Sequence, residues 1–120
     1  MNYNQNKKLA QITSQILIIG VDIAKFKHVA RAQDFRGIEF GSPCYFENTI
    51  EGFYHFLKWI SEIKKKQSMD KAVVGMEPTR HYWFNLAHIL KENDIKFVAV
   101  NPLHVKKTKE LVIIHQLKMM

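Results

Sequence analysis

Apolar residues in this chain are grouped in short runs with different periods. Residues 16–24 and 71–77 are nearly continuous apolar runs, a pattern typical of strands covered on both faces. Residues 28–35 alternate between apolar and polar, and the run over 38–46 is interrupted by a glycine and a proline, which favours an edge or bulged strand. The links between the runs at 16–24, 28–35 and 38–46 are short, which predicts that these three strands form an antiparallel meander.

Helical periodicity follows these runs. Asn48 and Glu51 fit a capping box that opens a helix, and the charged residues 64–67 end it. The remaining elements are a helix over 81–93, a strand over 95–100 and a helix that begins at Asn101-Pro102. The predicted order is βββαβαβα, which indicates a mixed α/β fold.

Composition narrows the class of protein. The chain has 120 residues, enough for one domain with a core, and a formal net charge of +7, which favours polyanionic partners such as nucleic acid. No apolar run is long enough to span a bilayer, and the start lacks a signal-peptide pattern. A single cysteine, Cys44, suits a reducing compartment. We therefore expect a cytoplasmic protein that binds nucleic acid and no membrane, with a flexible basic and polar arm over residues 1–15.

Two carboxylates end buried runs in the same way. Gly20 precedes Asp22 and Gly75 precedes Glu77, each pair with one apolar residue between its members. If the two strands are neighbours, the acids converge and repel each other unless they share a proton or a cation. Mg²⁺ accepts such oxygens together with water and substrate phosphates. The alternative is that each acid only caps a helix or starts a solvated loop.

Three segments carry a resemblance to a known family. Residues 20–28 (GVDIAKFKH), 75–83 (GMEPTRHYW) and 100–111 (VNPLHVKKTKEL) resemble the amino-terminal domain of the DEDD-type insertion-sequence transposases, which include the Piv-like DNA invertases. The resemblance covers residues 16–111. It implies a ribonuclease H-like (RuvC-like) fold with a five-stranded sheet, divalent-metal cleavage and joining of DNA strands, and in part of the family a structured guide RNA.

The resemblance assigns roles to individual residues. Asp22 matches the family's first acid and Glu77 its second, and both would be ligands of Mg²⁺ or Mn²⁺. The segment after the second acid usually reads E-x-T-G-x-Y in the family, and here Arg80 stands in place of the glycine. An arginine there would either clash with approaching nucleic acid or contact a phosphate.

Several basic residues are candidate contacts to nucleic acid. They are Lys25, His28, Arg80, Lys106, Lys107 and Lys109. For Lys25 and His28, which follow the first strand, the alternative is that they are simply exposed loop residues. The lysines at 64–66 are better explained as solvated charges at a favourable helix C-terminus than as a nucleic-acid site.

The family pattern also contains features that this sequence lacks. The family's other two acids lie in a K-x-D-x-x-D segment, and its carboxy-terminal domain supplies a serine nucleophile. We therefore expect a catalytically incomplete fragment with weak metal binding. Residues 112–120 are predicted to be an aberrant tail read in a shifted frame, because Met119-Met120 can only be encoded ATG ATG, which reads GAT, aspartate, in the neighbouring frame.

The sequence is compatible with three functions. The first is the amino-terminal catalytic fragment of a DNA transposase. The second is a stand-alone nucleic-acid-binding or regulatory module that associates with full-length transposase or with itself. The third is a fragment of a sugar-kinase or actin-like ATPase fold, for which the five glycines supply no clustered phosphate-binding turn.

Overall fold

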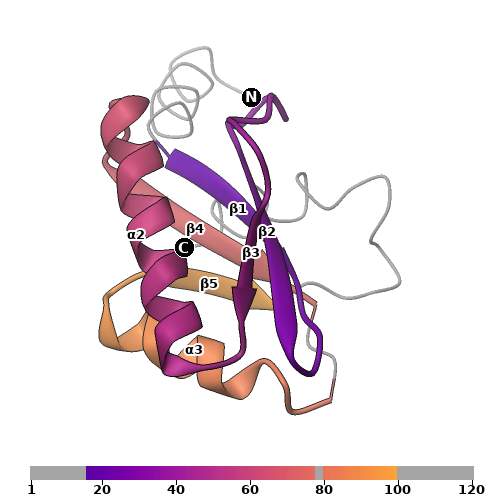
Figure 1. Ribbon diagram of the computed structural model, residues 1–120. Coiled ribbons are helices and arrows are strands. Elements are labelled where there is room, and N and C mark those ends of the chain that lie inside the picture. The colour runs from indigo at the N-terminus through magenta and orange to yellow at the C-terminus, as the bar shows by residue number, and fades with distance from the viewer. Residues whose placement is uncertain (1–15, 78–79, 100–120) are drawn as a thin grey trace, which may run out of the picture.

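A computed structural model describes residues 16–77 and 80–99 as one mixed sheet with two helices (Figure 1). The strands are β1 (Ile16–Asp22), β2 (Lys27–Gln33), β3 (Cys44–Glu47), β4 (Lys71–Met76) and β5 (Lys96–Ala99). The helices are α2 (Ile50–Lys66) and α3 (Phe84–Glu92). The predicted arm over 1–15, the helix at Asn101-Pro102 and the tail over 112–120 lie outside the described residues.

The sheet has the strand order β3-β2-β1-β4-β5. β1 pairs antiparallel with β2, and β2 with β3, so the expected meander is confirmed. β4 pairs parallel with β1, and β5 parallel with β4. A parallel neighbour requires a crossover connection, and here α2 and α3 provide the two crossovers. The predicted mixed five-stranded α/β sheet is therefore confirmed.

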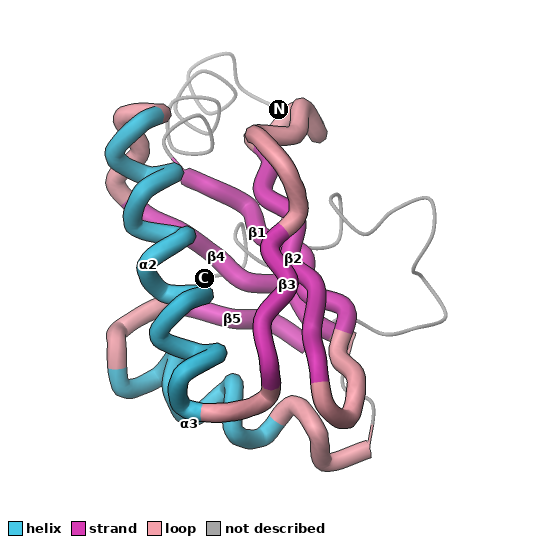
Figure 2. The backbone as a smooth tube through the Cα atoms, in the orientation of Figure 1, coloured by secondary structure: helices cyan, strands magenta, loops and turns pink. Residues whose placement is uncertain are grey.

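The buried residues of α2 and α3 belong to one core cluster, so both helices cover the same face of the sheet. Figure 2 shows α2 lying against this face. Leu17, Ile19 and Val21 of β1 point to this face and join the helix residues in the larger core cluster. Ile16 and Ile18 point to the opposite face and form a smaller buried cluster with residues of β4 and β5. Burial on both faces explains why the first apolar run is continuous rather than alternating.

The start of α2 differs from the predicted capping box. Thr49, not Asn48, is the N-cap, and its hydroxyl oxygen accepts a hydrogen bond of 3.1 Å from the Gly52 amide. Asn48 is engaged elsewhere, because its side-chain amide donates to the Lys25 carbonyl (3.2 Å). Gly52 packs directly on the end of β3, where an added Cβ would collide with the carbonyl oxygen of Glu47.

Both helices end in the same hydrogen-bonded motif. Ser68 and Asp94 follow the last helical residues with left-handed φ angles of 54° and 57°. The Met69 amide donates to the Lys64 carbonyl (2.8 Å), and the Ile95 amide makes the equivalent bond at 2.9 Å. This Schellman arrangement satisfies the helix carbonyls and turns Met69 and Ile95 into the larger core cluster. The chain therefore leaves each helix directly into a parallel strand.

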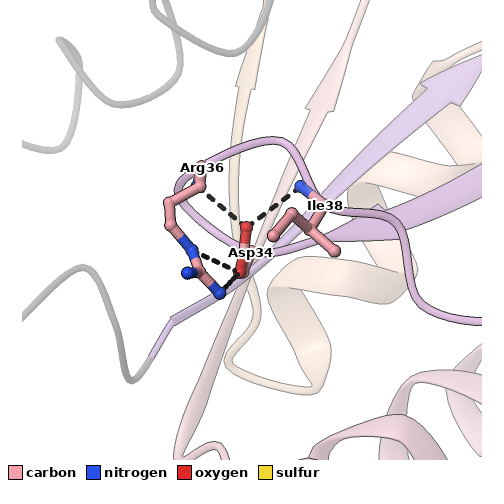
Figure 3. A network of polar contacts seen from close by, with 3 residues as sticks. All are labelled: Asp34, Arg36 and Ile38. Atoms are coloured by element: carbon pink, nitrogen blue, oxygen red, sulfur yellow. Dashed lines mark hydrogen bonds and ion pairs between the residues drawn. The ribbon is translucent and has the colours of Figure 1, made fainter.

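The predicted strand over 38–46 was wrong in its first part. β3 begins at Cys44, and before it only Glu39 forms an isolated bridge, to Gln33. The buried Asp34 carboxylate explains the loop (Figure 3), because it accepts hydrogen bonds from the amides of Arg36 (2.8 Å) and Ile38 (3.1 Å). The Arg36 guanidinium donates to the other carboxylate oxygen at 2.9 and 3.1 Å.

Burial alone would raise the pKa of Asp34. The hydrogen bonds from Ile38 and Arg36, together with the Arg36 charge, outweigh it and hold the pKa below the ordinary value of 3.8. Asp34 therefore stays ionised in the folded protein and keeps the chain between β2 and β3 closed.

The predicted helix over 81–93 begins later, at Phe84, because residues 80–83 form a turn. Trp83 occupies the N-cap without a side-chain hydrogen bond. No helix among the described residues is long and apolar enough to cross a bilayer.

The first prediction concerns Gly52. Gly52→Ala should lower the free energy of unfolding by about 1–3 kcal/mol, because the new methyl meets backbone that cannot move aside easily. Urea unfolding measures the change, and Glu62→Ala on the exposed side of α2 is the control, with an expected effect within about 0.5 kcal/mol. A stabilised Gly52→Ala, as helix propensity alone would give, contradicts the predicted clash.

Candidate metal and nucleic-acid site

The two acids lie where parallel strands β1 and β4 end. Val21 pairs with Met76 across the two strands, and Asp22 and Glu77 are the next residue on each. Asp22 is exposed and Glu77 is half-buried. The expectation that these two strands are neighbours is confirmed, and neighbouring parallel strands lie about 4.8 Å apart.

The face on which the acids lie follows from the alternation of side chains. Val21 and Met76 point toward α2 and α3, so their successors Asp22 and Glu77 belong to the opposite face. The in-register pair of Gly20 and Gly75 occupies this opposite face one step back along the strands. No side chain from either strand therefore stands directly behind the acids on their own face.

The donor set limits how a metal could be held. Within residues 16–77 and 80–99, no group of three or more His, Cys, Asp or Glu side chains is arranged to hold a metal ion. Two carboxylates are the hard oxygen donors that Mg²⁺ and Mn²⁺ accept, and such ions keep several waters or substrate phosphates. Asp22 and Glu77 thus fit such a cation in kind and would supply only part of its coordination.

The structure corrects the placement of His28. It lies in β2, not in a loop, and its side chain is fully buried. It has the same strand parity as the buried Ala30 and Ala32, so its ring points into the core and packs edge-on against Phe46 with 5.2 Å between centroids. A buried ring cannot contact a nucleic-acid backbone, and Nδ1 instead accepts a hydrogen bond from the Ala24 amide (3.1 Å).

His28 and Asn48 together hold the loop that follows Asp22. The Asn48 amide donates to the Phe26 carbonyl (2.9 Å), and its side chain donates to the carbonyl of Lys25. His28 Nε2 and Asn48 Oδ1, a donor and an acceptor, are both buried without a hydrogen bond of good geometry. Burial lowers the pKa of His28 below 6.5, and the contact with Asn48 offsets this only in part. The neutral ring is therefore a structural link between this loop and the start of α2.

The remaining basic candidates are exposed or undescribed. The Lys25 ammonium lies 5.0 Å from the centre of the Phe26 ring, which is 74% exposed. Phe26 was not among the predicted contacts, although it directly follows Lys25 in the sequence. The predicted contacts Lys106, Lys107 and Lys109 lie outside the described residues.

Arg80 stands in a backbone conformation that favours glycine. Its φ is 51°, in the left-handed region that costs a residue with a Cβ about 1–2 kcal/mol. The sequence suggested that the family's glycine there allows close approach of nucleic acid. The dihedral angle gives a second and independent reason for a glycine at this position.

Comparison with known proteins identifies the family. The sequence model of the DEDD transposases of the IS110 type, described as "Transposase", matches residues 19–118. This match spans most of the chain, so the protein belongs to this transposase family, as the three segments around Asp22, Glu77 and residues 100–111 suggested. The mixed sheet agrees with the ribonuclease H-like fold expected of such a domain. The match also continues past residue 111.

No curated protein sequence matches the chain. Among solved structures, the chain is similar to the ethanolamine utilization protein EutJ from Carboxydothermus hydrogenoformans, with a TM-score of 0.43 and 12% sequence identity. The similarity covers 69% of this chain and 35% of that protein.

The second prediction concerns the protonation of His28. Because burial resists protonation of the folded ring, the unfolded chain takes up a proton first as the pH falls below 6.5. The free energy of unfolding should therefore decrease on the acid side of that value, by at most about 1.4 kcal/mol per pH unit. His28→Gln should remove this part of the slope, measured by urea unfolding from about pH 7 to pH 5.

Exposed His55 supplies the control for this measurement. His55→Gln should keep the wild-type slope, since its ring is not buried in the core. An unchanged slope in His28→Gln would show that folding does not alter the protonation of His28.

The third prediction concerns the backbone at Arg80. Arg80→Gly should raise the free energy of unfolding by about 0.5–1 kcal/mol, because glycine adopts the left-handed conformation without a steric cost. Arg80→Ala is the matched control, since it removes the charge but keeps the Cβ, and it should give no such gain. Equal effects of the two substitutions would assign the change to the charge instead of the backbone.

Proposed function

We propose that this chain acts in metal-dependent cleavage and joining of DNA strands, with Asp22 and Glu77 as ligands of Mg²⁺ or Mn²⁺. The observation that carries the proposal is the parallel register of β1 and β4, in which Val21 pairs with Met76 just before the two acids. Membership of the transposase family supports it, because the family implies DNA as a partner and generally uses divalent metals.

The chain's own residues would act on a phosphodiester in two ways. The carboxylates of Asp22 and Glu77 bind hard oxygen-seeking cations, which neutralise phosphate charge and activate a nucleophile in phosphodiester chemistry. Lys25 and Arg80 are exposed and follow the two acids closely in the chain, where their charges would attract the phosphates on either side. Two carboxylates supply only part of the coordination of such a cation, so we propose that Asp22 and Glu77 by themselves form an incomplete catalytic site.

One observation favours a second candidate function. The described residues offer two carboxylates and no third metal-binding side chain beside them. A domain with this donor set would bind nucleic acid better than it cuts it, which suits a regulatory module. Its proposed partners are DNA, a guide RNA, and full-length transposase or a second copy of this chain, in the cytoplasm. Co-purification with full-length transposase would support this candidate over catalysis.

The fourth prediction tests the acid pair. Asp22→Asn and Glu77→Gln should each weaken Mn²⁺ binding by at least about tenfold, since even loss of an outer-shell partner costs 10–100-fold. Isothermal titration with Mn²⁺ measures the affinity, and urea unfolding checks that each variant folds. Glu62→Gln, an exposed carboxylate on α2, is the control and should bind as the wild type does. Unchanged affinity in both acid variants would contradict the proposed site.

A further inference from the structure

A pocket of about 430 Å³ opens at the edge of the sheet opposite to the acids. Ile16, Lys71 and Lys96 line it, and they are the first residues of β1, β4 and β5. Asp22, in contrast, is the last residue of β1. The three parallel strands therefore begin at this pocket and run toward the acids.

Lysines from three different elements meet in this pocket. Lys64 comes from the last turn of α2 and is half-buried, while Lys71 and Lys96 come from strands. The Schellman motif after α2 produces this convergence, because the chain reverses within a few residues and enters β4 at Lys71. Lys64 is therefore not simply a solvated charge at a helix end, as the sequence suggested.

Lys64 and Lys71 take part in none of the ion pairs found among the described residues, so their ammonium groups could bind an anion. Arg31 pairs with Glu39, Arg36 with Asp34 and His88 with Glu92 in the described part of the chain, and neither lysine belongs to these ion pairs. Asp70 and Asp94 also line the pocket, which reduces the repulsion among its lysines without pairing with Lys64 or Lys71.

We propose that this amino-edge lysine pocket binds backbone phosphates of a nucleic-acid strand, with Lys64 and Lys71 as the contacting residues. Lysine is a point charge suited to phosphate, and the net charge of +7 draws polyanions to the protein. A concave pocket lined by half-buried Lys64 and exposed Lys71 suits a single backbone segment, whereas a lipid surface requires a flatter face. A strand of nucleic acid is therefore the occupant that the pocket fits.

The pocket and the acids contact different phosphates. β1 runs seven residues from Ile16 to Asp22, which at about 3.3 Å per residue separates the two places by roughly 20 Å. Along the axis of a duplex each strand carries one phosphate per about 3.4 Å, so a duplex lying parallel to β1 would place roughly six phosphate steps over this distance. The pocket would hold a strand away from the reacting bond. This inference rests on the proposed nucleic-acid binding, but not on the metal chemistry.

The fifth prediction compares two pairs of lysine substitutions with equal charge change. The salt dependence of binding to mixed-sequence DNA and RNA oligonucleotides is measured in EDTA for Lys64→Gln/Lys71→Gln and for Lys58→Gln/Lys65→Gln. The slope of log K against log salt should fall by about 1.4–1.8 in the pocket pair, two contacts at about 0.7–0.9 each. It should fall by less than about 0.5 in the control pair, whose lysines are exposed on α2 outside the pocket.

Several outcomes would overturn the pocket. Equal loss of slope in both pairs would assign binding to overall charge, and no loss in either would exclude contact at Lys64 and Lys71. Wild-type binding to anionic phosphatidylserine vesicles but to neither nucleic acid would make the surface a membrane contact instead. If the double variant does not fold, the single variants Lys64→Gln and Lys71→Gln replace it. In each of them the slope of log K against log salt should fall by about 0.7–0.9.

The acid pair is tested separately from the pocket. Asp22→Asn/Glu77→Gln should lose Mn²⁺ affinity, measured in the absence of nucleic acid. If the pocket variants lose slope but the acid variants retain Mn²⁺, the proposed chemistry fails and the pocket stands. If the acid variants lose Mn²⁺ and the pocket variants keep their slope, the pocket fails alone.

Discussion

The parallel pairing of β1 with β4 is the constraint on which the rest of the structure depends. Two strands that run the same way cannot be joined by a tight turn, so the chain must cross the sheet between them. The helix α2 makes this crossing, and its apolar side fills the face that Leu17, Ile19 and Val21 present. The same pairing sets the carboxyl ends of both strands at one edge of the sheet.

The turns after α2 and α3 connect each helix to the following parallel strand within a few residues. Ser68 and Asp94 both accept a left-handed conformation that costs a residue with a Cβ about 1–2 kcal/mol. The hydrogen bonds of the Schellman motif and the burial of Met69 and Ile95 offset that cost. Neither position holds glycine, and the helix ends were still predicted within a residue or two, at 64–67 and at 93, from the charged and polar residues there.

The central strands could be predicted from the sequence because they are buried on both faces. A continuous apolar run such as Ile16–Val21 has few alternatives in a short α/β chain, and the repeated glycine-x-acid ending indicated that β1 and β4 are neighbours. Strand boundaries at the sheet edge were less predictable, because they depend on the Asp34 carboxylate, whose partners Arg36 and Ile38 are fixed only by the fold.

Those residues of the candidate site that lie on strands could be placed from the alternation of side chains along the strand. Because side chains alternate along β2, His28 lies on the same face as Ala30 and Ala32. This alternation could have placed His28 in the core. The convergence of Lys64 with Lys71 had no such signal, since it depends on the turn between a helix and a strand. The conformation of Arg80 did have a signal, because the family pattern carries a glycine at this position, the residue that adopts a positive φ most easily.

The arrangement of charge along the parallel strands follows from their common direction. Strand starts gather at one edge and strand ends at the other, so one lysine at the start of β4 and another at the start of β5 meet by topology alone. The acids meet at the opposite edge for the same reason. A polyanion is attracted by the first edge and repelled by the second unless a cation lies between them. The sheet would thus separate a site that holds a strand from a site that reacts only with metal present.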